Sequence, residues 1–356
     1  MGTVLNIIYF VLILSAIIIV HELGHLIAAK RFGVYCKEFS IGMGPIVWQR
    51  QKGETAWSIR ALPIGGFVAM AGEPGEEEDD EDSIPYERTI NGIKIWKQII
   101  IMAAGAIMNI LLAWALFIGI TAYQGAVSIP GKPVIGSVNK SSPAQVAGMK
   151  AGDEIVELQH GETIVVPKTF SDVQEFMQYY PGTSEFSVKR DNEIVKLTIT
   201  PEYVKSEGMY LMGVVQDTTS RSIKKISLLE SIPYGTDKMV TSVTSIFDAL
   251  GNLVKGVGLN NLSGPVGIYN VTTQITKDGL LSSLALVGLL SVNVGIFNLL
   301  PIPILDGGRI FIILIETLIG RKLSERVQNA VMMAGMLALI GIMVFATWND
   351  IVRLFM

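Results

Sequence analysis

Four apolar stretches along the chain are long enough to cross the hydrocarbon core of a bilayer, which takes about 20 residues of helix. They are residues 5–29, 99–123, 280–319 and 331–348, and the third is interrupted near Asp306. The first stretch lacks the basic start and the small-residue cleavage site of a signal peptide, so we expect it to be a span. The pattern predicts a polytopic α-helical membrane protein with four transmembrane helices.

The basic residues between these stretches predict the orientation of the spans. Nine Lys and Arg residues lie between positions 30 and 97, and Arg321, Lys322 and Arg326 lie between the third and fourth spans. Cytoplasmic loops are enriched in Lys and Arg, so both loops are expected on the cytoplasmic side. The N-terminus, the long segment between the second and third spans, and the C-terminus are then extracytoplasmic.

The segment between the first two spans has the pattern of short strands separated by Gly-rich turns. The predicted strands are residues 39–42, 46–49, 56–59 and 65–70. Their apolar content favours a membrane-associated β-hairpin region that enters the protein or the membrane interface. Open sheet edges are not tolerated in lipid, so the neighbouring helices must shield such hairpins.

Residues 131–215 form a soluble island with a different pattern. Predicted strands at 133–138, 154–158, 185–189 and 194–200 surround a predicted helix at 170–179, which ends before Pro181 and Gly182. The sequence SPAxxAGxxxGDxI, residues 142–155, resembles a PDZ domain in the circularly permuted form found in bacterial proteases. An inserted α+β PDZ domain of this kind binds an extended peptide as an added strand.

Residues 223–257 carry apolar side chains at near-helical spacing. One or two amphipathic helices are expected, lying either on the outer membrane face, or against the PDZ-like island, or packed within their own domain. His160 lies in a predicted turn of the island without a cluster of ligands, so no catalytic role is expected for it.

Composition agrees with a membrane protein. Charged residues make up only 17 % of the chain, against about 25 % in soluble domains. The net charge of −4 says little, because the acidic run at residues 76–82 supplies much of it, and we expect this run to be a solvated loop. No nucleic-acid partner is expected. The single cysteine, Cys36, excludes an intrachain disulfide. A zinc ligand is one role open to it, but it lies outside the apolar stretch without a nearby partner, so a structural or inert role is expected.

Two histidines and a glutamate form the motif His21-Glu22-Leu23-Gly24-His25 inside the first apolar stretch. On a helix the two histidines lie one turn apart on one face and can share a Zn²⁺ ion, while the adjacent Glu22 can act as general base. Ionisable residues inside a span cost roughly 2.5–3.5 kcal/mol each and are usually functional. The alternatives are a chance match at a helix end or a polar patch that gates a channel.

A catalytic zinc site usually takes three protein ligands and leaves one position open. Asp306 is the best candidate for the third ligand, because it interrupts the third span. Pro301 and Pro303 cannot continue a regular helix, and broken backbone at membrane depth is tolerated where it faces protein or a water-filled cavity. Glu316 is a weaker candidate, because it lies near the basic loop and can extend to the interface.

Together these motifs resemble the site-2 protease family of intramembrane zinc metalloproteases, in its bacterial regulator-of-sigma-E protease branch. The HExxH sequence at residues 21–25 matches the first family motif. Leu305-Asp306-Gly307 matches the LDG motif, which supplies the third zinc ligand in that family. The resemblance covers nearly the whole chain, with one PDZ-like island where some relatives carry two. It implies a multi-pass protein of the bacterial inner membrane.

The resemblance extends to segments that contact substrate. Residues 291–299 are similar to the segment before LDG whose Asn residues help to hold substrate, here Asn293 and Asn298. Residues 39–45 and 62–70 are similar to a membrane-reentrant β-loop. An edge strand there, with the residues Gly65, Gly66, Phe67 and Val68, is expected to hold an unwound substrate by strand addition. The alternative role for the two Asn residues is helix–helix contact.

The expected organisation runs from a first transmembrane helix with HExxH (1–30) and a β-loop region with the acidic loop (31–98), through the second transmembrane helix (99–123), the PDZ domain (131–215) and the amphipathic segment (223–257), to the third (280–319) and fourth (331–348) transmembrane helices. The implied reaction is hydrolysis of peptide bonds in the transmembrane segments of membrane proteins. Trimmed anti-sigma factors and remnant signal peptides are both compatible substrates.

Two rival functions belong to other classes. A membrane scaffold with a structural metal site predicts a fourth ligand, and none is evident in the sequence. A metal transporter requires several intramembrane carboxylates along a route, and only Glu22, Asp306 and Glu316 are available.

Overall fold

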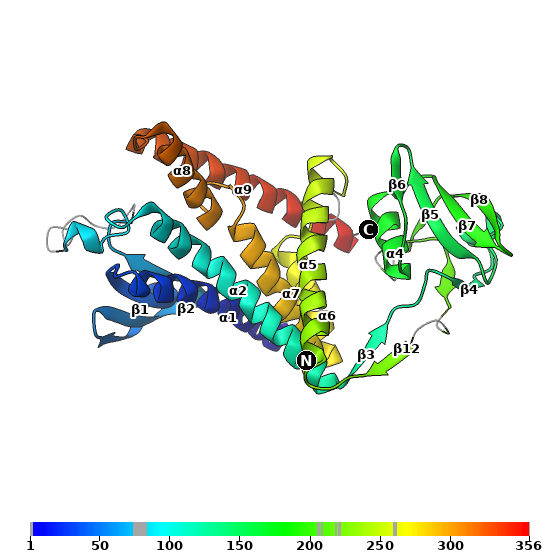
Figure 1. Cartoon of the computed structure of the whole chain (residues 1–356), viewed down its shortest axis with the longest axis horizontal. Coiled ribbons are helices and arrows are strands. Elements are labelled where there is room, and N and C mark those ends of the chain that lie inside the picture. Colours follow the sequence, from blue (N-terminus) through cyan, green and yellow to red (C-terminus); the bar gives the residue numbers. More distant parts are fainter. Residues whose placement is uncertain are drawn as a thin grey trace. The chain divides into compact units, whose positions relative to one another are not determined.

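The computed structural model describes residues 3–73, 84–204, 207, 209–217, 219, 222–258 and 262–355 (Figure 1). The acidic run at residues 76–82 lies outside the described residues. Contacts divide the chain into two compact units. The helical unit comprises Met1–Ile120, Ile232–Ile246 and Ser263–Leu354, and the β-rich unit comprises Thr121–Ser231, Phe247–Leu262 and Phe355–Met356.

Among the described residues, four helices are long and apolar enough to cross a membrane, which confirms the predicted number of spans. They are α1 (Thr3–Arg31), α2 (Ile95–Gln124), α7 (Leu280–Asn298) and α9 (Glu325–Phe355). The predicted third stretch is two separate helices, because α7 ends before Pro301 and Pro303 and α8 (Asp306–Ile319) begins after them. Asp306 therefore lies in the first turn of a helix.

Further helices complete the helical unit. The first part of α5 (Ser231–Val254) packs against α2, where the indole of Trp114 donates a 2.9 Å hydrogen bond to the Thr236 hydroxyl. Helix α6 (Pro265–Ile275) is followed by the short helix η4 (Thr276–Asp278), and η2 (Tyr86–Arg88) precedes α2. The carboxylate of Asp350 on α9 accepts hydrogen bonds from the backbone N–H groups of Gly264 and Gly267, at 2.8 and 2.7 Å. Asp350 thus caps α6 from far along the sequence.

The segment between the first two spans forms one long antiparallel hairpin, β1 (Cys36–Lys52) and β2 (Thr55–Met70). The four predicted short strands are parts of these two. Ile41 has Cα partners in both halves of β2, at Ile59 and at Gly66, so the start of β1 lies between two segments of β2. Residues 66–70 have partners only in β1 in the described structure, which makes this segment an edge of the sheet.

The base of the hairpin is buried, whereas much of the rest is exposed and apolar. Cys36, Phe39 and Met70 belong to a core that also contains Leu26 of α1 and Ile101 of α2. Further along the hairpin, several large apolar side chains are exposed, namely Met43, Ile46, Val47, Trp48, Ile59 and Leu62. The core fixes the hairpin against the end of α1 that carries the HExxH motif.

The β-rich unit contains a four-stranded sheet in the order β6-β5-β7-β8. These strands are β5 (Glu154–His160), β6 (Thr163–Val165), β7 (Ser184–Arg190) and β8 (Glu193–Ile199), and helix α4 covers Phe170–Tyr179 as predicted. The short helix α3 (Pro143–Val146) begins at Ser142, whose hydroxyl accepts a hydrogen bond from the Gln145 N–H. The order of strands and helices follows the one expected for the island, and its assignment as a PDZ domain stays a prediction.

Three two-stranded pairs accompany this sheet. Strand β4 (Ile135–Val138) pairs with β11 (Val214–Gln216), and β9 (Glu202–Val204) pairs with β10 (Met209–Leu211). Strand β3 (Ala126–Ile129) pairs with β12 (Ser222–Lys225). The segment 223–257, predicted to be helical, therefore begins with a strand, because pairing with a distant partner overrides the local helical spacing.

The Asp153 carboxylate anchors the end of this sheet. It accepts two hydrogen bonds from the Arg190 guanidinium, at 2.7 and 2.8 Å, and one from the Lys150 N–H, at 2.8 Å. Burial opposes ionisation of this carboxyl, but these hydrogen bonds hold the pKa of Asp153 below its ordinary value. Asp153 is the aspartate of the SPAxxAGxxxGDxI sequence. Its hydrogen bonds explain why this position of the sequence holds an aspartate.

We predict that Arg190→Met destabilises the β5–β7 pairing by about 1–3 kcal/mol at neutral pH, because the buried Asp153 acceptors lose their partners. The lowered pKa stabilises the fold above the unfolded-state pKa of about 3.9 and this contribution is lost as the pH falls through the folded-state pKa. The difference between variant and parent should therefore shrink below about pH 4. Amide hydrogen exchange of β5 and β7 in the full-length protein gives the free energy of opening this pairing, and comparison of variant and parent measures the difference.

The exposed pair of Lys196 with Glu185, 2.6 Å apart, provides the matched control. Lys196→Met should change the opening free energy by less than about 1 kcal/mol at any pH. An equal effect of both variants at neutral pH contradicts the assignment of Asp153 as the anchor.

Candidate metal centre

The histidines of the HExxH motif lie in α1 where it packs closely on α2. His21 and His25 are only 7 % and 5 % exposed. A Cβ atom on Gly24 of the motif would stand 2.4 Å from the Ala104 carbonyl oxygen, and one on Gly105 would stand 2.4 Å from His25 Nε2. Both positions therefore require glycine, and the small residues let the helices approach until the imidazoles are enclosed.

Helix α8 brings Asp306 to the same place. The chain between α7 and α8 folds back onto the first turn of α8, so that a Cβ on Gly307 or Gly308 would lie 2.2–2.4 Å from carbonyl oxygens of residues 299–302. Ile304 has a φ of 94°, which a β-branched residue rarely adopts. The DGG sequence thus permits a tight, strained turn that aims the Asp306 side chain at the histidines.

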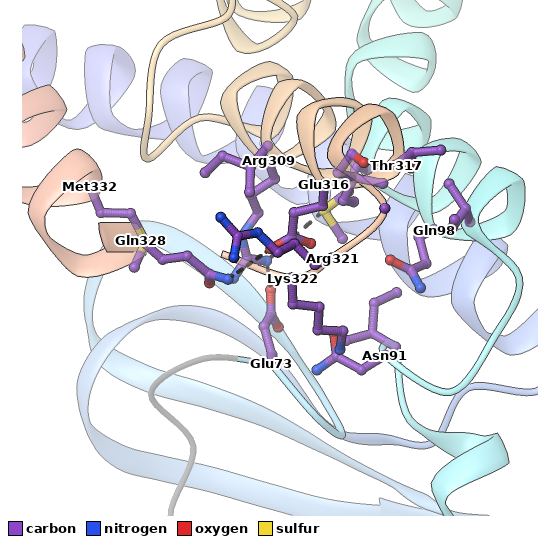
Figure 2. Close-up of a pocket in the computed structure, with 16 residues that line it drawn as sticks. Glu73, Asn91, Gln98, Arg309, Glu316, Thr317, Arg321, Lys322, Gln328 and Met332 are labelled. Atoms are coloured by element: carbon purple, nitrogen blue, oxygen red, sulfur yellow. Dashed lines mark hydrogen bonds and ion pairs between the residues drawn. The ribbon is translucent and has the colours of Figure 1, made fainter. Parts of the chain in front are cut away.

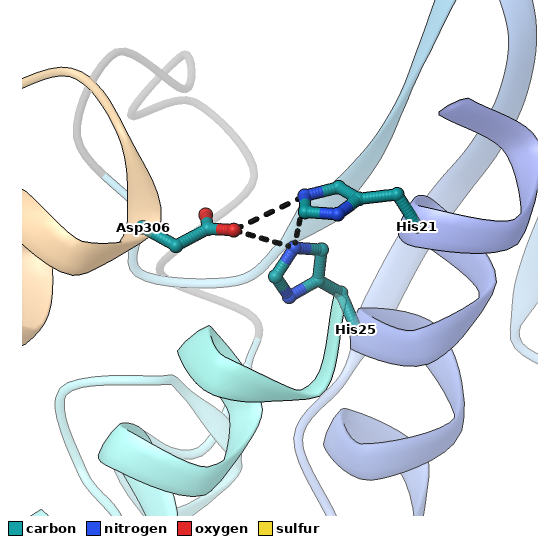
Figure 3. A group of neighbouring side chains, drawn as sticks. All are labelled: His21, His25 and Asp306. Carbon is teal, nitrogen blue, oxygen red and sulfur yellow. Dashed lines mark hydrogen bonds and ion pairs between the residues drawn. The ribbon is translucent and has the colours of Figure 1, made fainter. Parts of the chain in front are cut away.

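Three potential ligand atoms meet at this point (Figure 3). Asp306 Oδ2 lies 3.1 Å from His21 Nε2 and 3.3 Å from His25 Nε2, and the two Nε2 atoms are 3.2 Å apart. Tetrahedral ligands at about 2.0–2.2 Å from a zinc ion lie roughly 3.3–3.5 Å from one another. Asp306 Oδ2 is also buried, and no group in the described part of the chain gives it a hydrogen bond. Both the donor set and its spacing fit a divalent metal such as zinc.

The remaining imidazole nitrogens have partners that orient the rings. His25 Nδ1 lies 2.8 Å from the Ile101 carbonyl oxygen, so it carries the proton and leaves Nε2 free to bind a metal. His21 Nδ1 lies 3.4 Å from the side-chain nitrogen of Asn109, which is fully buried on α2. The Asn109 Oδ1 atom has no hydrogen-bond partner among the described residues, and reversing this amide lets Oδ1 accept the Nδ1–H of His21.

Sequence reasoning did not single out Asn109. The signal was available, because Asn109 is an uncharged polar residue in the middle of the second apolar span. Its backbone carbonyl also accepts a 2.8 Å hydrogen bond from the Ser291 hydroxyl of α7. Asn109 therefore connects the second and third spans beside the metal centre.

A cavity of about 540 Å³ opens beside the three ligand atoms. Glu22 lines it, as do Asn298 at the end of α7 and residues 67–70 of the edge strand, which include Phe67 and Val68. Of the other predicted residues, Gly66 lies near Glu22 and Gly65 lies near Met43. A Cβ atom on Gly66 would stand 3.6 Å from Glu22 Cγ, and one on Gly65 would stand 3.6 Å from Met43 Cγ. Asn293 is half-buried on α7 and is not among the residues that line this cavity.

The weaker candidate ligands lie elsewhere. Glu316 accepts hydrogen bonds from the Leu323 N–H and the Gln328 amide, at 2.8 and 3.0 Å, and does not belong to the ligand group. Burial raises the pKa of the Cys36 thiol to about 11, so it is not a ready thiolate ligand. His160 contacts the Ser184 hydroxyl at 2.9 Å within the β-rich unit. In the described parts of the chain, no fourth His, Cys, Asp or Glu joins His21, His25 and Asp306.

Comparison with known proteins places this chain in a family. The profile of peptidase family M50 matches residues 9–342. The regulator of sigma-W protease RasP of Bacillus subtilis is 31 % identical, over 99 % of this chain and 99 % of that protein. The zinc metalloprotease RasP of Bacillus licheniformis is 33 % identical, over 99 % and 100 %. The chain therefore belongs to peptidase family M50, the site-2 proteases, and is a multi-pass membrane zinc metalloprotease.

Proposed function

We propose that this protein hydrolyses peptide bonds in transmembrane segments of other membrane proteins, with His21, His25 and Asp306 as zinc ligands and Glu22 as general base. One observation carries the proposal. Three ligand atoms at zinc-like spacing lie beside a cavity that Glu22 also lines, at the end of an apolar helix long enough to cross a membrane. The absence of a fourth His, Cys, Asp or Glu from the described group favours a catalytic over a structural site.

The chemistry divides between the metal and the side chains. Zinc, when bound, polarises the scissile carbonyl and makes water acidic enough to attack near neutral pH. Glu22 takes the proton from the attacking water and delivers it to the leaving amine nitrogen. The hydrogen bond from His25 Nδ1 to the Ile101 carbonyl keeps the ring in the tautomer that binds metal. Asn109 does the same for His21 when its Oδ1 faces the ring.

The substrate segment must be extended at the scissile bond, because a helix hides its carbonyl groups in hydrogen bonds. Residues 66–70 present an unpaired strand edge, and Phe67 to Met70 line the metal cavity. Strand addition at this edge would supply the lost backbone hydrogen bonds. Asn298, which lines the same cavity, is proposed to bond the exposed backbone, and Asn293 is proposed to assist from the preceding turns of α7.

The name of one relative supports part of the proposed substrate class. The Bacillus subtilis relative is named a regulator of sigma-W protease, which supports a trimmed anti-sigma factor as one proposed substrate. A remnant signal peptide is a second proposed substrate and rests on the family resemblance of the sequence motifs. The proposed location is the bacterial inner membrane, with the metal centre towards the cytoplasm. The N-terminus, the C-terminus and the β-rich unit, proposed to be a PDZ domain, are extracytoplasmic in this arrangement.

We predict that Glu22→Gln keeps bound zinc but lowers cleavage of a transmembrane reporter at least about 100-fold, because proton transfer is lost. Asp306→Ala, His21→Ala and His25→Ala should each lose both zinc and cleavage. Zinc is counted by mass spectrometry on detergent-purified protein. Full zinc occupancy in Asp306→Ala would contradict the ligand assignment, and normal cleavage by Glu22→Gln would contradict the role of Glu22 as general base. No cleavage by the parent protein would favour a scaffold or transporter.

Asn109→Leu should weaken zinc affinity about 10–100-fold, because the His21 ring loses the partner of its Nδ1 atom. Asn109→Asp keeps an acceptor oxygen at this position, so its zinc affinity should fall less than that of Asn109→Leu. The measurement is zinc competition with a chelator of known affinity. Asn298→Leu is the control, since its proposed contact is with substrate: it should raise KM and leave zinc affinity unchanged.

Topology can be tested with single cysteines in a Cys36→Ser background, because Lys322 and Glu193 are both exposed whereas Cys36 is buried. Lys322→Cys should react with a membrane-impermeant thiol reagent only after the cytoplasmic face is opened. Glu193→Cys should react with the same reagent in cells whose outer layer has been removed and whose inner membrane is intact. The reverse labelling pattern would overturn the proposed orientation.

A further inference from the structure

An ion pair joins the helix that carries Asp306 to the end of the edge strand. The Arg309 guanidinium contacts the Glu73 carboxylate (Figure 2). Arg309 lies three residues after Asp306, in the same first turn of α8, and Glu73 lies three residues after Met70, the last residue of β2. Arg309 thus lies about one helical turn from the proposed third ligand, and Glu73 lies three residues beyond the proposed substrate strand.

The pair is largely enclosed. The side chains of Arg309 and Glu73 are 30 % and 19 % exposed, and Met102 of α2 lies beside the guanidinium, with its sulfur 3.9 Å from Nη1. Both charged residues line the metal cavity and also a neighbouring cavity of about 480 Å³, so the pair forms part of the wall between them. Removing either side chain would leave the other charge unpaired in partly buried surroundings, which is unfavourable.

The first turn of α8 needs such support. A helix start has few internal hydrogen bonds, and here it follows the strained Ile304. The Arg309 N–H closes the first turn by bonding to the Leu305 carbonyl oxygen at 3.1 Å, and its side chain then reaches the hairpin. The same residue therefore closes the turn and ties it to a second element.

We propose that Glu73 and Arg309 are positioning residues that hold Asp306 at ligand distance from the two histidines and at a fixed spacing from the edge strand. The proposal rests on the proposed zinc ligands. Glu73 is not part of the ligand group, and the Arg309 guanidinium has no atom that binds a cation. The pair acts by fixing where α8 starts relative to β2, so its loss first affects the third ligand.

A second ion pair allows this role to be separated from general stability. Arg60 and Glu38 are 2.9 Å apart, with side chains 21 % and 17 % exposed, and both belong to the hairpin. This pair has similar burial to the first but does not join α8. Glu38→Gln is therefore the matched control for Glu73→Gln.

The test measures zinc affinity of the purified full-length protein by chelator competition, together with thermal stability in detergent. Glu73→Gln and Arg309→Met should each weaken zinc binding about tenfold, as expected for residues that orient a metal ligand without binding the metal. The charge-reversed double variant Glu73→Arg with Arg309→Glu should recover most of that loss. Glu38→Gln should leave zinc affinity unchanged. If Arg309→Met does not fold, the Glu73→Gln and double variants still decide.

Unchanged zinc affinity in folded Glu73→Gln, an equal loss in Glu38→Gln, or no recovery in the double variant would overturn the proposal. Asp306→Asn separates this outcome from failure of the proposed function. If Asp306→Asn keeps its zinc, the ligand assignment itself is wrong. If Asp306→Asn loses zinc while Glu73→Gln does not, only the positioning role fails.

Discussion

The close approach of α1 and α2 at Gly24 and Gly105 is the constraint on which the metal centre depends. Each glycine lies so close to an atom of the other helix that a Cβ atom would clash with it. The two imidazoles are enclosed as a result, and the hydrogen-bond partners of their outer nitrogens both come from α2, at Ile101 and Asn109. A wider spacing of these helices would expose the rings and leave their tautomers unset.

Polar groups inside this apolar bundle are costly unless each has a partner, and this explains how the parts are joined. Ser291 of α7 bonds to the backbone of Asn109, and Asp350 of α9 caps α6. Each such bond connects elements that are far apart in the sequence. Satisfying one polar side chain therefore also fixes the packing of a second helix, so stability and site geometry have the same origin.

The interruption before α8 has two consequences. The proline-containing turn ends α7 and lets a new helix begin at Asp306, so the carboxylate lies at a helix start rather than within a continuous span. The same turn leaves the first residues of α8 short of internal hydrogen bonds and strained at Ile304. Contacts from outside the helix, including that of Arg309 with Glu73, then matter more than they would in mid-helix.

Features that depend on neighbouring residues could be predicted from the sequence. The histidine spacing, the four apolar stretches and the break at Asp306 are local patterns, and helix 170–179 matched because a capping box of Thr169 with Asp172 sets its start. Which distant groups meet became visible in the folded chain: Asn109 beside His21, the merging of four short strands into β1 and β2, and the strand at 222–225. These depend on contacts between residues separated by tens to hundreds of positions, and a local pattern of apolar and polar residues carries no information about such partners.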